Sequence, residues 1–362
     1  MIMKRIILFV IAIVVFSAVS CTDKNDEDIP DRLPEDDAGL MAPANSYIIS
    51  ASGSYSFPAV KGGSTESVGD VASAEILWES FGTDVRPSVG DLISSVSYSN
   101  GKISYSVSSP FKEGNAVIAA KDASGEILWS WHIWLTDQPQ EQVYANNAGT
   151  MMDRNLGATS ATPGDIGALG LLYQWGRKDP FLGSASIVSS VEAESTGLWP
   201  SATPSSEESG TIDYTVHNPM TLITYNNHNF DWYYTGSSST DDSRWQSDKT
   251  IYDPCPSGWR VPDGGETGLW AVAGFADDSF DDENCGISFN AGDPLSESWY
   301  PAAGYRYSSA GILGNVGKYG YYWSVTPSGR YAYFFYFYYD GAAYPFDSFR
   351  RAYAQSVRCV RG

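Results

Sequence analysis

Residues 45–136 alternate between apolar and polar positions in short runs that turn residues interrupt. A period of two is typical of β-strands. The Asn-Gly pair in SNGK (99–102) predicts a tight hairpin turn, and KDASGE (121–126) predicts a second one. The pattern therefore predicts an all-β unit, which we place at residues 42–140 and expect to be a β-sandwich.

The run ILWSWHIWL (127–135) has bulky side chains at both odd and even positions. Because successive side chains of a strand point to opposite faces, this run predicts a strand covered on both faces, in the centre of the sandwich. His132 belongs to this run and has no second metal-ligating residue nearby. We therefore expect His132 to be a packed strand residue.

The polar segment 136–150 predicts a link to a second region, residues 150–362, in which loops and single tryptophans dominate. GALGLLYQWGRKDPF (167–181) is the best helix candidate, because its apolar residues recur at helical spacing and an Asp-Pro pair ends it.

Two aromatic runs follow, at 317–329 and 330–346. Consecutive aromatic residues predict strands buried on both faces, with Asp340-Gly341 as the hairpin turn. Core strands are one interpretation of these tyrosines. A ligand platform made by tyrosines outside the core is the other, since aromatic faces stack on sugar rings and anchor interfaces.

The N-terminus carries Lys4 and Arg5 before an apolar run that ends Ala-Val-Ser-Cys at Cys21. The run is short for a membrane span and predicts a secretory signal over residues 1–20. Small residues before a cysteine resemble the bacterial lipobox, which implies that Cys21 carries a lipid. The alternative is an ordinary signal peptide with an incidental cysteine.

Eight acidic and two basic residues follow between Thr22 and Asp37. This composition predicts a disordered tether, which we place at residues 21–41. An acidic run after a lipidated cysteine resembles the surface-export signal of Bacteroidota lipoproteins. We therefore expect the mature chain to be lipid-anchored in the outer membrane and exposed at the cell surface.

The net charge of −21 argues against nucleic acid as a partner, because binding to phosphates needs clustered Lys and Arg. Its main expected effect is solubility. The acidic pairs at 241–242, 277–278 and 281–283 are interpreted as solvated turns. Calcium bound by these oxygens is a minor alternative, since the sequence has no EF-hand loop. We expect no other cofactor.

Three cysteines remain besides Cys21. An exported chain favours disulfides, and an odd number leaves at least one thiol free or paired elsewhere. The sequence has no CxxC and no HExxH, which argues against a structural zinc. It has no GxSxG, no phosphate-binding loop and no histidine in a recognisable catalytic motif, so we predict no catalytic residues.

Four blocks of the second region occur in a fixed order: DPCPSGWRVPDGGE (253–266), GYRYSSAG (304–311), YYWSVTPSG (321–329) and QSVRCVRG (355–362). This order closely resembles the Fibrobacter succinogenes major paralogous domain, which has a CPxGWRVP block, a GYR block, a YWS block and a terminal SVRCV strand. MMDRNLGAT (151–159) is similar to its opening strand. The residues that match the family motif are Asp253, Pro254, Pro256, Gly258, Trp259, Arg260, Val261, Pro262, Gly304, Tyr305, Arg306, Trp323 and Ser324.

The resemblance implies a C-type-lectin-like fold for residues 150–362, so the expected fold is mainly β with an α+β C-terminal part. The resemblance also implies a disulfide between Cys255 and Cys359. The EPN, QPD and WND motifs of sugar-binding lectins are absent, so the likeness concerns the fold alone. The candidate ligand contacts are exposed aromatic residues near the hairpins, namely Tyr305, Tyr307, Tyr338 and Tyr344.

That fold is related to the formylglycine-generating oxidases, which use two redox-active cysteines shortly before a terminal strand. Here residues 340–358 contain no cysteine. We therefore expect a non-catalytic cell-surface lipoprotein, a binding or adhesion module for a glycan or a protein, with fimbrial subunits among its candidate partners. The alternatives are a structural pilus or envelope subunit that exchanges strands and, less favoured, such an oxidase.

Overall fold

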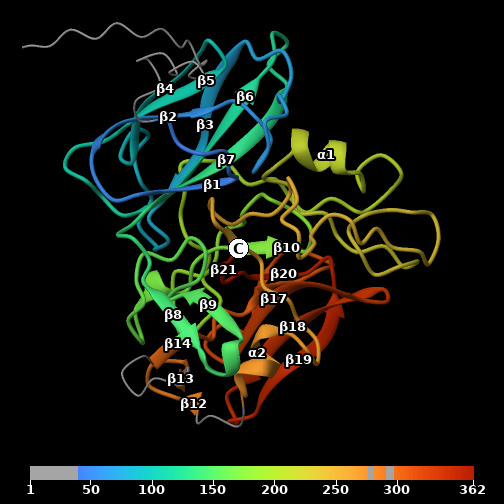
Figure 1. The fold of residues 1–362 in the computed structure, drawn as a ribbon. Coiled ribbons are helices and arrows are strands. Elements are labelled where there is room, and N and C mark those ends of the chain that lie inside the picture. The colour runs from blue at the N-terminus through green and yellow to red at the C-terminus, as the bar shows by residue number, and fades with distance from the viewer. Residues whose placement is uncertain (1–39, 276–279, 291–296) are drawn as a thin grey trace, which may run out of the picture. The chain divides into compact units, whose positions relative to one another are not determined.

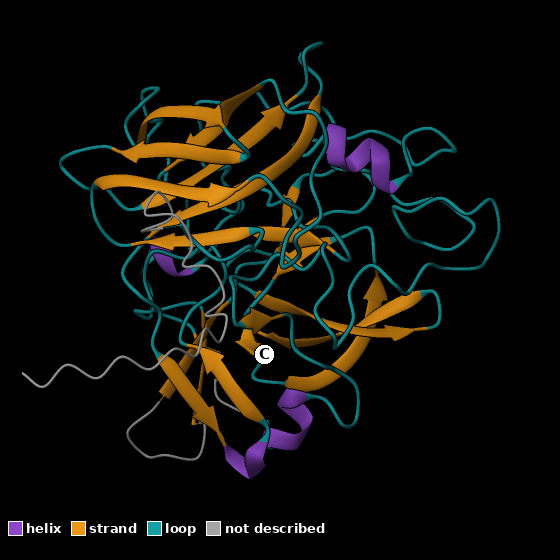
Figure 2. Cartoon of the chain, turned by 45° about the horizontal axis from the view of Figure 1, so that its top comes forward, coloured by secondary structure: helices purple, strands orange, loops and turns teal. Residues whose placement is uncertain are grey.

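The computed structural model describes residues 40–275, 280–290 and 297–362 (Figure 1). Cys21, the predicted signal peptide and nearly all of the predicted tether lie outside these residues. Strands and long loops dominate the described chain, and its helices are few and short (Figure 2). The protein is therefore mainly β, as the alternation predicted. Within the described ranges, no helix has both the length and the apolar character needed to cross a membrane.

Two sheets between residues 46 and 135 enclose a shared core. Their strand orders are β1-β7-β6-β3 and β2-β5-β4. Phe57 of the second sheet stacks on Tyr47 of the first, with ring centroids 4.3 Å apart, and also contacts Trp131. The strands are β1 (Ser46–Ile49), β2 (Gly53–Pro58), β3 (Ser73–Ser80), β4 (Ile93–Ser99), β5 (Lys102–Val107), β6 (Gly114–Lys121) and β7 (Ile127–Leu135).

Both predicted hairpin turns are present. Asn100 and Gly101 have φ values of 49° and 76° and join β4 to β5. Two successive residues with positive φ match the right-handed twist of a hairpin, and Asn and Gly tolerate that conformation best. The KDASGE segment joins β6 to β7, which pair along nearly their whole length.

β7 is a central strand, and its two faces have different neighbours. Trp129, Trp131 and Ile133 belong to the core between the two sheets. On the other face, the hydroxyl of Ser130 donates to Asp179, and the indole of Trp134 donates to the carbonyl of Ala158. The bulk on both faces of this strand therefore has a structural reason: the second face packs against the C-terminal half of the chain.

The C-terminal half contains three further sheets. The largest has the order β16-β15-β20-β17-β18-β19, with β10 paired to β20, and the others have the orders β11-β21-β9-β8 and β12-β13-β14. The strands are β8 (Glu141–Tyr144), β9 (Gly149–Met152), β10 (Leu172–Gln174), β11 (Trp259–Arg260), β12 (Phe280–Asp281), β13 (Gly286–Asn290), β14 (Glu297–Pro301), β15 (Tyr305–Arg306), β16 (Leu313–Gly314), β17 (Tyr319–Ser328), β18 (Tyr331–Tyr338), β19 (Ala343–Arg350), β20 (Ala354–Ser356) and β21 (Val360–Arg361). The helices are α1 (Ile212–His217), α2 (Leu269–Ala273) and the 3-10 turns η2 (Ala145–Asn147) and η3 (Ile166–Ala168).

The helix predicted over residues 167–181 is wrong. The segment contains the end of η3, then β10, which pairs with β20. Gly170 and Gly176 have φ values of 71° and 80°, which an α-helix does not admit. The Gln174 amide donates to the carbonyls of Ile223 and Ala352, residues far away in the sequence. These long-range bonds override the helical spacing of the apolar residues.

The two aromatic runs form the strands that the sequence predicted. β17 pairs with β18, and β18 pairs with β19 across the Asp340-Gly341 turn. Phe335 and Phe337 lie in one hydrophobic core, with Tyr322, while Phe334 lies in another, with Trp323. The sheet therefore has a core on each face, which explains why consecutive positions are aromatic.

Candidate functional site

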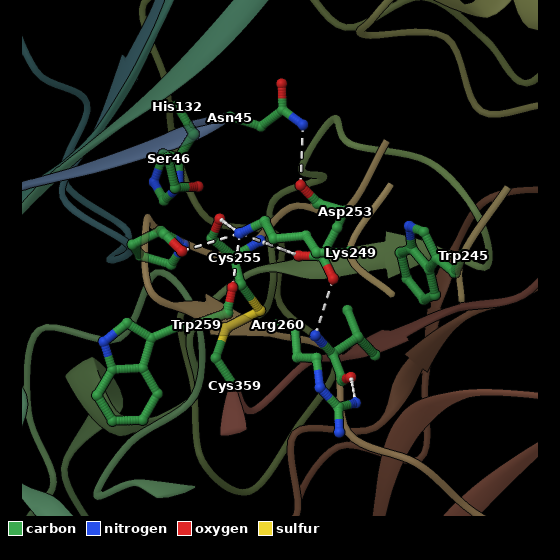
Figure 3. Close-up of a disulfide and its surroundings, with 12 residues drawn as sticks. Asn45, Ser46, His132, Trp245, Lys249, Asp253, Cys255, Trp259, Arg260 and Cys359 are labelled. Atoms are coloured by element: carbon green, nitrogen blue, oxygen red, sulfur yellow. Dashed lines mark hydrogen bonds and ion pairs between the residues drawn. A yellow bond between two sulfur atoms is a disulfide. The ribbon is translucent and has the colours of Figure 1, made fainter. Parts of the chain in front are cut away.

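The residues of the first family block gather around a disulfide (Figure 3). The sulfur atoms of Cys255 and Cys359, the pair predicted from the resemblance, are 2.07 Å apart, and both residues are fully buried. They are 104 residues apart in the sequence. The bond therefore ties the 253–262 loop to the last strand, β21.

A partly buried lysine closes the same loop. The Lys249 ammonium donates to the carbonyl oxygens of Cys255, Pro256 and Trp259 at 2.6, 2.8 and 2.6 Å (Figure 3). The Asp253 carboxylate accepts from the backbone N–H groups of Cys255 and Val261. Burial raises the pKa of the Asp253 carboxyl and lowers the pKa of the Lys249 ammonium, and the attraction between the two opposes both shifts. The Lys249 ammonium and the Asp253 carboxylate therefore form their hydrogen bonds within the loop and are not available to a ligand.

The tryptophan and arginine of this block have packing roles. The Arg361 guanidinium lies 5.2 Å from the centre of the Trp259 ring, and Arg260 donates to Asp263 at 2.6 Å. Gly258 has a φ of 77°, a conformation that favours glycine. The neighbouring motif residues Pro254, Pro256 and Val261 are buried, and the carbonyl of Pro262 accepts from the Val325 N–H.

The other family blocks also serve the fold. Gly304 has a φ of 65°, and a Cβ there would lie 2.2 Å from the carbonyl oxygen of Gly314. The Trp323 indole donates to the carbonyl of Tyr173, and the Ser324 hydroxyl donates to the carbonyl of Tyr333. The motif residues thus stabilise loops and strands. They do not converge on a common site.

The four predicted contact tyrosines, in contrast, belong to one array on the sheet of β15 and β17–β19. We call this array the tyrosine row. Each ring contacts the next, with centroid distances between 5.3 and 6.1 Å along the path from Tyr307 to Tyr344. The row consists of Tyr305, Tyr307, Tyr319, Tyr321, Tyr336, Tyr338 and Tyr344.

Tyr319, Tyr321 and Tyr336 were missed as contact candidates. The signal that could have found them is the period of two in β17 and β18. Tyr319 and Tyr321 alternate on one face of β17 and pair with Tyr338 and Tyr336 across the strands. Residues that alternate along paired strands stand side by side, so the register assembles the row.

The exposure of the rings varies along the row. Tyr321 is buried, at 7 % exposure, whereas Tyr307 and Tyr344 at its two ends are 38 % and 39 % exposed. From Tyr321 through Tyr319 and Tyr338 to Tyr344, neighbouring planes are within 19° of parallel. Stacked neighbours cover one another's faces, so the middle of the row offers ring edges and hydroxyls. The ends have room for a ligand to stack on a ring.

Several phenol groups of the row have a raised pKa. Burial, together with the nearby Asp347 carboxylate, raises the pKa of Tyr336 to about 12. A hydrogen bond with Tyr344 is the main cause that raises the pKa of Tyr338, and burial raises the pKa of Tyr305. The phenols of Tyr305, Tyr336 and Tyr338 therefore keep their protons at neutral pH, so they donate and accept hydrogen bonds and do not act as bases.

The acidic pairs considered for calcium make local contacts. Asp241 accepts from the N–H and hydroxyl of Ser243, Asp242 pairs with Arg351 at 2.6 Å, and Asp281 accepts from Asn284. The pair 277–278 lies outside the described residues. Within the described ranges, no group of three or more His, Cys, Asp or Glu side chains has the arrangement of a metal site.

Comparison with known proteins gave no match to a family model, to a curated protein or to a solved structure.

Proposed function

We propose that this protein is a non-catalytic lipoprotein of the outer-membrane surface and that its tyrosine row binds the ligand. The observation that supports this proposal is the tyrosine row. It brings Tyr305 and Tyr307, at β15, together with Tyr338 of β18 and Tyr344 of β19 in one continuous array with exposed ends. A chain gains little by exposing the aromatic rings at the ends of this array to water, and exposed aromatic clusters mark binding surfaces.

The chemistry of the row suits a glycan or a protein surface. Tyrosine combines a flat apolar face, which stacks on sugar rings and aromatic side chains, with a hydroxyl that bonds to polar groups. The rings are held by their neighbours, so little side-chain entropy is lost when a ligand binds. A rigid array with hydroxyls fits repeated, weak contacts of the kind that adhesion requires.

The described cysteines support a non-catalytic function. Cys255 and Cys359 are joined to each other, and burial raises the pKa of the Cys285 thiol. A thiol with a raised pKa is a poor nucleophile and a poor metal ligand. A formylglycine-generating oxidase would need a pair of reactive thiols, and these three residues do not form one.

Attachment to the cell surface rests on the sequence before the described residues. The apolar run, Cys21 and the eight acids between Thr22 and Asp37 fit a lipid anchor followed by an acidic tether. Such a tether holds the binding module away from the membrane. In this arrangement a glycan of another cell or a fimbrial subunit is within reach.

The experiment is a binding screen with the lipid-free chain 22–362. A glycan array and a set of purified fimbrial subunits are probed with the natural chain and with a Tyr338→Ala/Tyr344→Ala variant. Binding that the double substitution removes supports the proposal. Absence of binding to both ligand sets, or binding that the variant retains in full, refutes it. Mass analysis of the cellular protein tests the anchor, since an unmodified Cys21 would contradict it.

A further inference from the structure

A cavity of about 230 Å³ lies between the chain segment 181–202 and the β15–β16 hairpin. Its lining combines aromatic and aliphatic side chains with one ion pair. It is separate from the tyrosine row, although the two share a strand. Tyr305 and Arg306 are successive residues of β15, so their side chains point to opposite faces of the sheet. The lining of the cavity includes Glu192, Trp199, Ser201, Arg306, Ala310 and Ile312.

Arg306 is fixed in the wall of this cavity. Its guanidinium donates to the carbonyls of Leu182 and Gly311, each at 2.8 Å, and to the Glu192 carboxylate. These contacts use three of its five N–H donors. The Arg306 side chain is 9 % exposed, whereas that of Glu192 is 57 % exposed. The cavity wall therefore contains an Arg306–Glu192 ion pair without net charge. Arg306 is fixed, and the exposed Glu192 carboxylate is accessible to a ligand.

Apart from Ser201, the side chains in the rest of the cavity lining are apolar. Trp199 is partly buried, with its indole N–H bonded to the Ser195 hydroxyl, so its orientation is set before any ligand arrives. Ile312 is 63 % exposed. Pockets for drug-sized molecules measure roughly 300–1,000 Å³. A cavity below that range admits about one ring.

The combination selects the chemical class of the ligand. An apolar side chain would cover the Glu192 carboxylate without replacing its bonds to water, which is costly. An anion would be repelled by the same carboxylate. An uncharged ring with one apolar face and hydroxyls around its edge avoids both costs. Its apolar face can pack on Trp199, and its hydroxyls can bond to Glu192, Ser201 and Arg306.

We propose that this cavity binds a single uncharged sugar ring. The proposal does not depend on the tyrosine row, because none of the cavity residues belongs to it. A chain with both sites would hold one sugar in the cavity and a second ligand on the row.

The test uses the lipid-free chain 22–362 and a panel of probes. The probes are the methyl glycosides of glucose, galactose, mannose and N-acetylglucosamine, methyl glucuronide as the anionic comparison, and N-acetylphenylalaninamide as the apolar one. Saturation-transfer NMR detects binding and titration calorimetry measures it. We expect at least one neutral glycoside to bind with a Kd on the order of 1 mM. The glucuronide and the amide should bind at least tenfold more weakly.

Four variants decide where the glycoside binds. Ala310→Trp places a large ring at the mouth without removing a core contact, and it should abolish binding. Ser309→Trp, at the exposed neighbouring position, is the matched control and should leave binding intact. Glu192→Gln should weaken binding about three- to tenfold. Tyr344→Ala should leave the Kd unchanged, which separates this site from the tyrosine row.

The proposal is overturned if no neutral glycoside binds, if the amide binds better than every glycoside, or if Ala310→Trp binds as well as Ser309→Trp. Thermal unfolding of each variant shows whether the chain is folded. If Ala310→Trp unfolds, Ile312→Trp replaces it, since that side chain also lines the cavity and is mostly exposed. Loss of glycan or fimbrial binding in the Tyr338→Ala/Tyr344→Ala variant would leave this result unaffected.

Discussion

Tyr336 and Tyr344 pair across β18 and β19, with ring centroids 4.6 Å apart and planes inclined by 6°. Tyr336 is partly buried, whereas Tyr344 is 39 % exposed. This stack is the outer end of the tyrosine row. Tyr336 packs against one face of the Tyr344 ring and fixes its orientation, while the exposed part of Tyr344 remains accessible to a ligand.

Replacement of Tyr344 by Ala should therefore weaken ligand binding. An aromatic contact contributes about 0.5–1.5 kcal/mol beyond its buried area, so we expect affinity to fall roughly three- to tenfold or more. Titration of the ligand found in the binding screen measures this. Tyr98→Ala, at a partly buried tyrosine of β4, is the control and should bind normally. Equal affinity of the two variants would remove Tyr344 from the site.

The disulfide should be a major source of stability. It closes a loop between residues 104 positions apart, and removal of a native disulfide costs about 2–5 kcal/mol in small secreted domains, mainly through the unfolded chain. We expect Cys255→Ala/Cys359→Ala to lower the free energy of unfolding by that amount in a urea titration. Cys285→Ser, which removes the free thiol, should cost less than about 1.5 kcal/mol.

A mass map provides an independent check of the same pairing. Under denaturing, non-reducing conditions only the Cys285 thiol among the described cysteines should react with an alkylating agent. If Cys255 and Cys359 were alkylated without reductant, the bond would be absent from the protein.

Part of the stabilisation that Lys249 provides should depend on Asp253. Lys249→Met leaves three carbonyl groups without their donor and the Asp253 carboxylate without its partner. Removal of one member of a buried ion pair costs roughly 3–5 kcal/mol. Lys249→Met/Asp253→Asn should recover part of that loss, because no unpaired charge then remains buried. A double-mutant cycle in urea measures the coupling, and strictly additive losses would contradict it.

His132 should make stability depend on pH. Burial lowers the pKa of its imidazole to about 3. Nε2 lies 2.8 Å from Oδ1 of the Asn115 side chain, and Nδ1 lies 3.0 Å from the Ser46 hydroxyl, which suits a neutral ring that donates from Nε2. The unfolded chain, with an ordinary histidine pKa near 6.5, takes up a proton first as the pH falls. The folded state therefore loses stability from about pH 6.5 down to about pH 3, by about 1.4 kcal/mol per pH unit.

His132→Gln isolates this contribution. The carboxylates of the chain titrate in the same range, but they titrate in both proteins and cancel in the difference. Between pH 6.5 and 4.5 the natural chain should lose about 2–3 kcal/mol more than the variant. Urea titrations at several pH values measure this. Parallel pH profiles would show that His132 does not contribute.

The sequence determined those features whose cause is local. The alternation of polar and apolar residues specifies the strands, and the pairs Asn100-Gly101 and Asp340-Gly341 specify hairpins, because a positive φ is tolerated by few residues. The consecutive aromatic residues of β18 require a core on each face. These patterns depend on neighbours along the chain, so they can be interpreted without the fold.

The tertiary structure decided what depends on partners far away in the sequence. Residues 172–174 form a strand because β20 pairs with them, although their spacing favours a helix. The second face of β7 is buried because the C-terminal half covers it. The tyrosine row needs the register of β17, β18 and β19, and the cavity beside β15 needs Glu192 and Arg306, which are 114 positions apart, to meet. Side chains so far apart in the sequence come into contact only when the whole chain folds, so no local sequence pattern predicts these contacts.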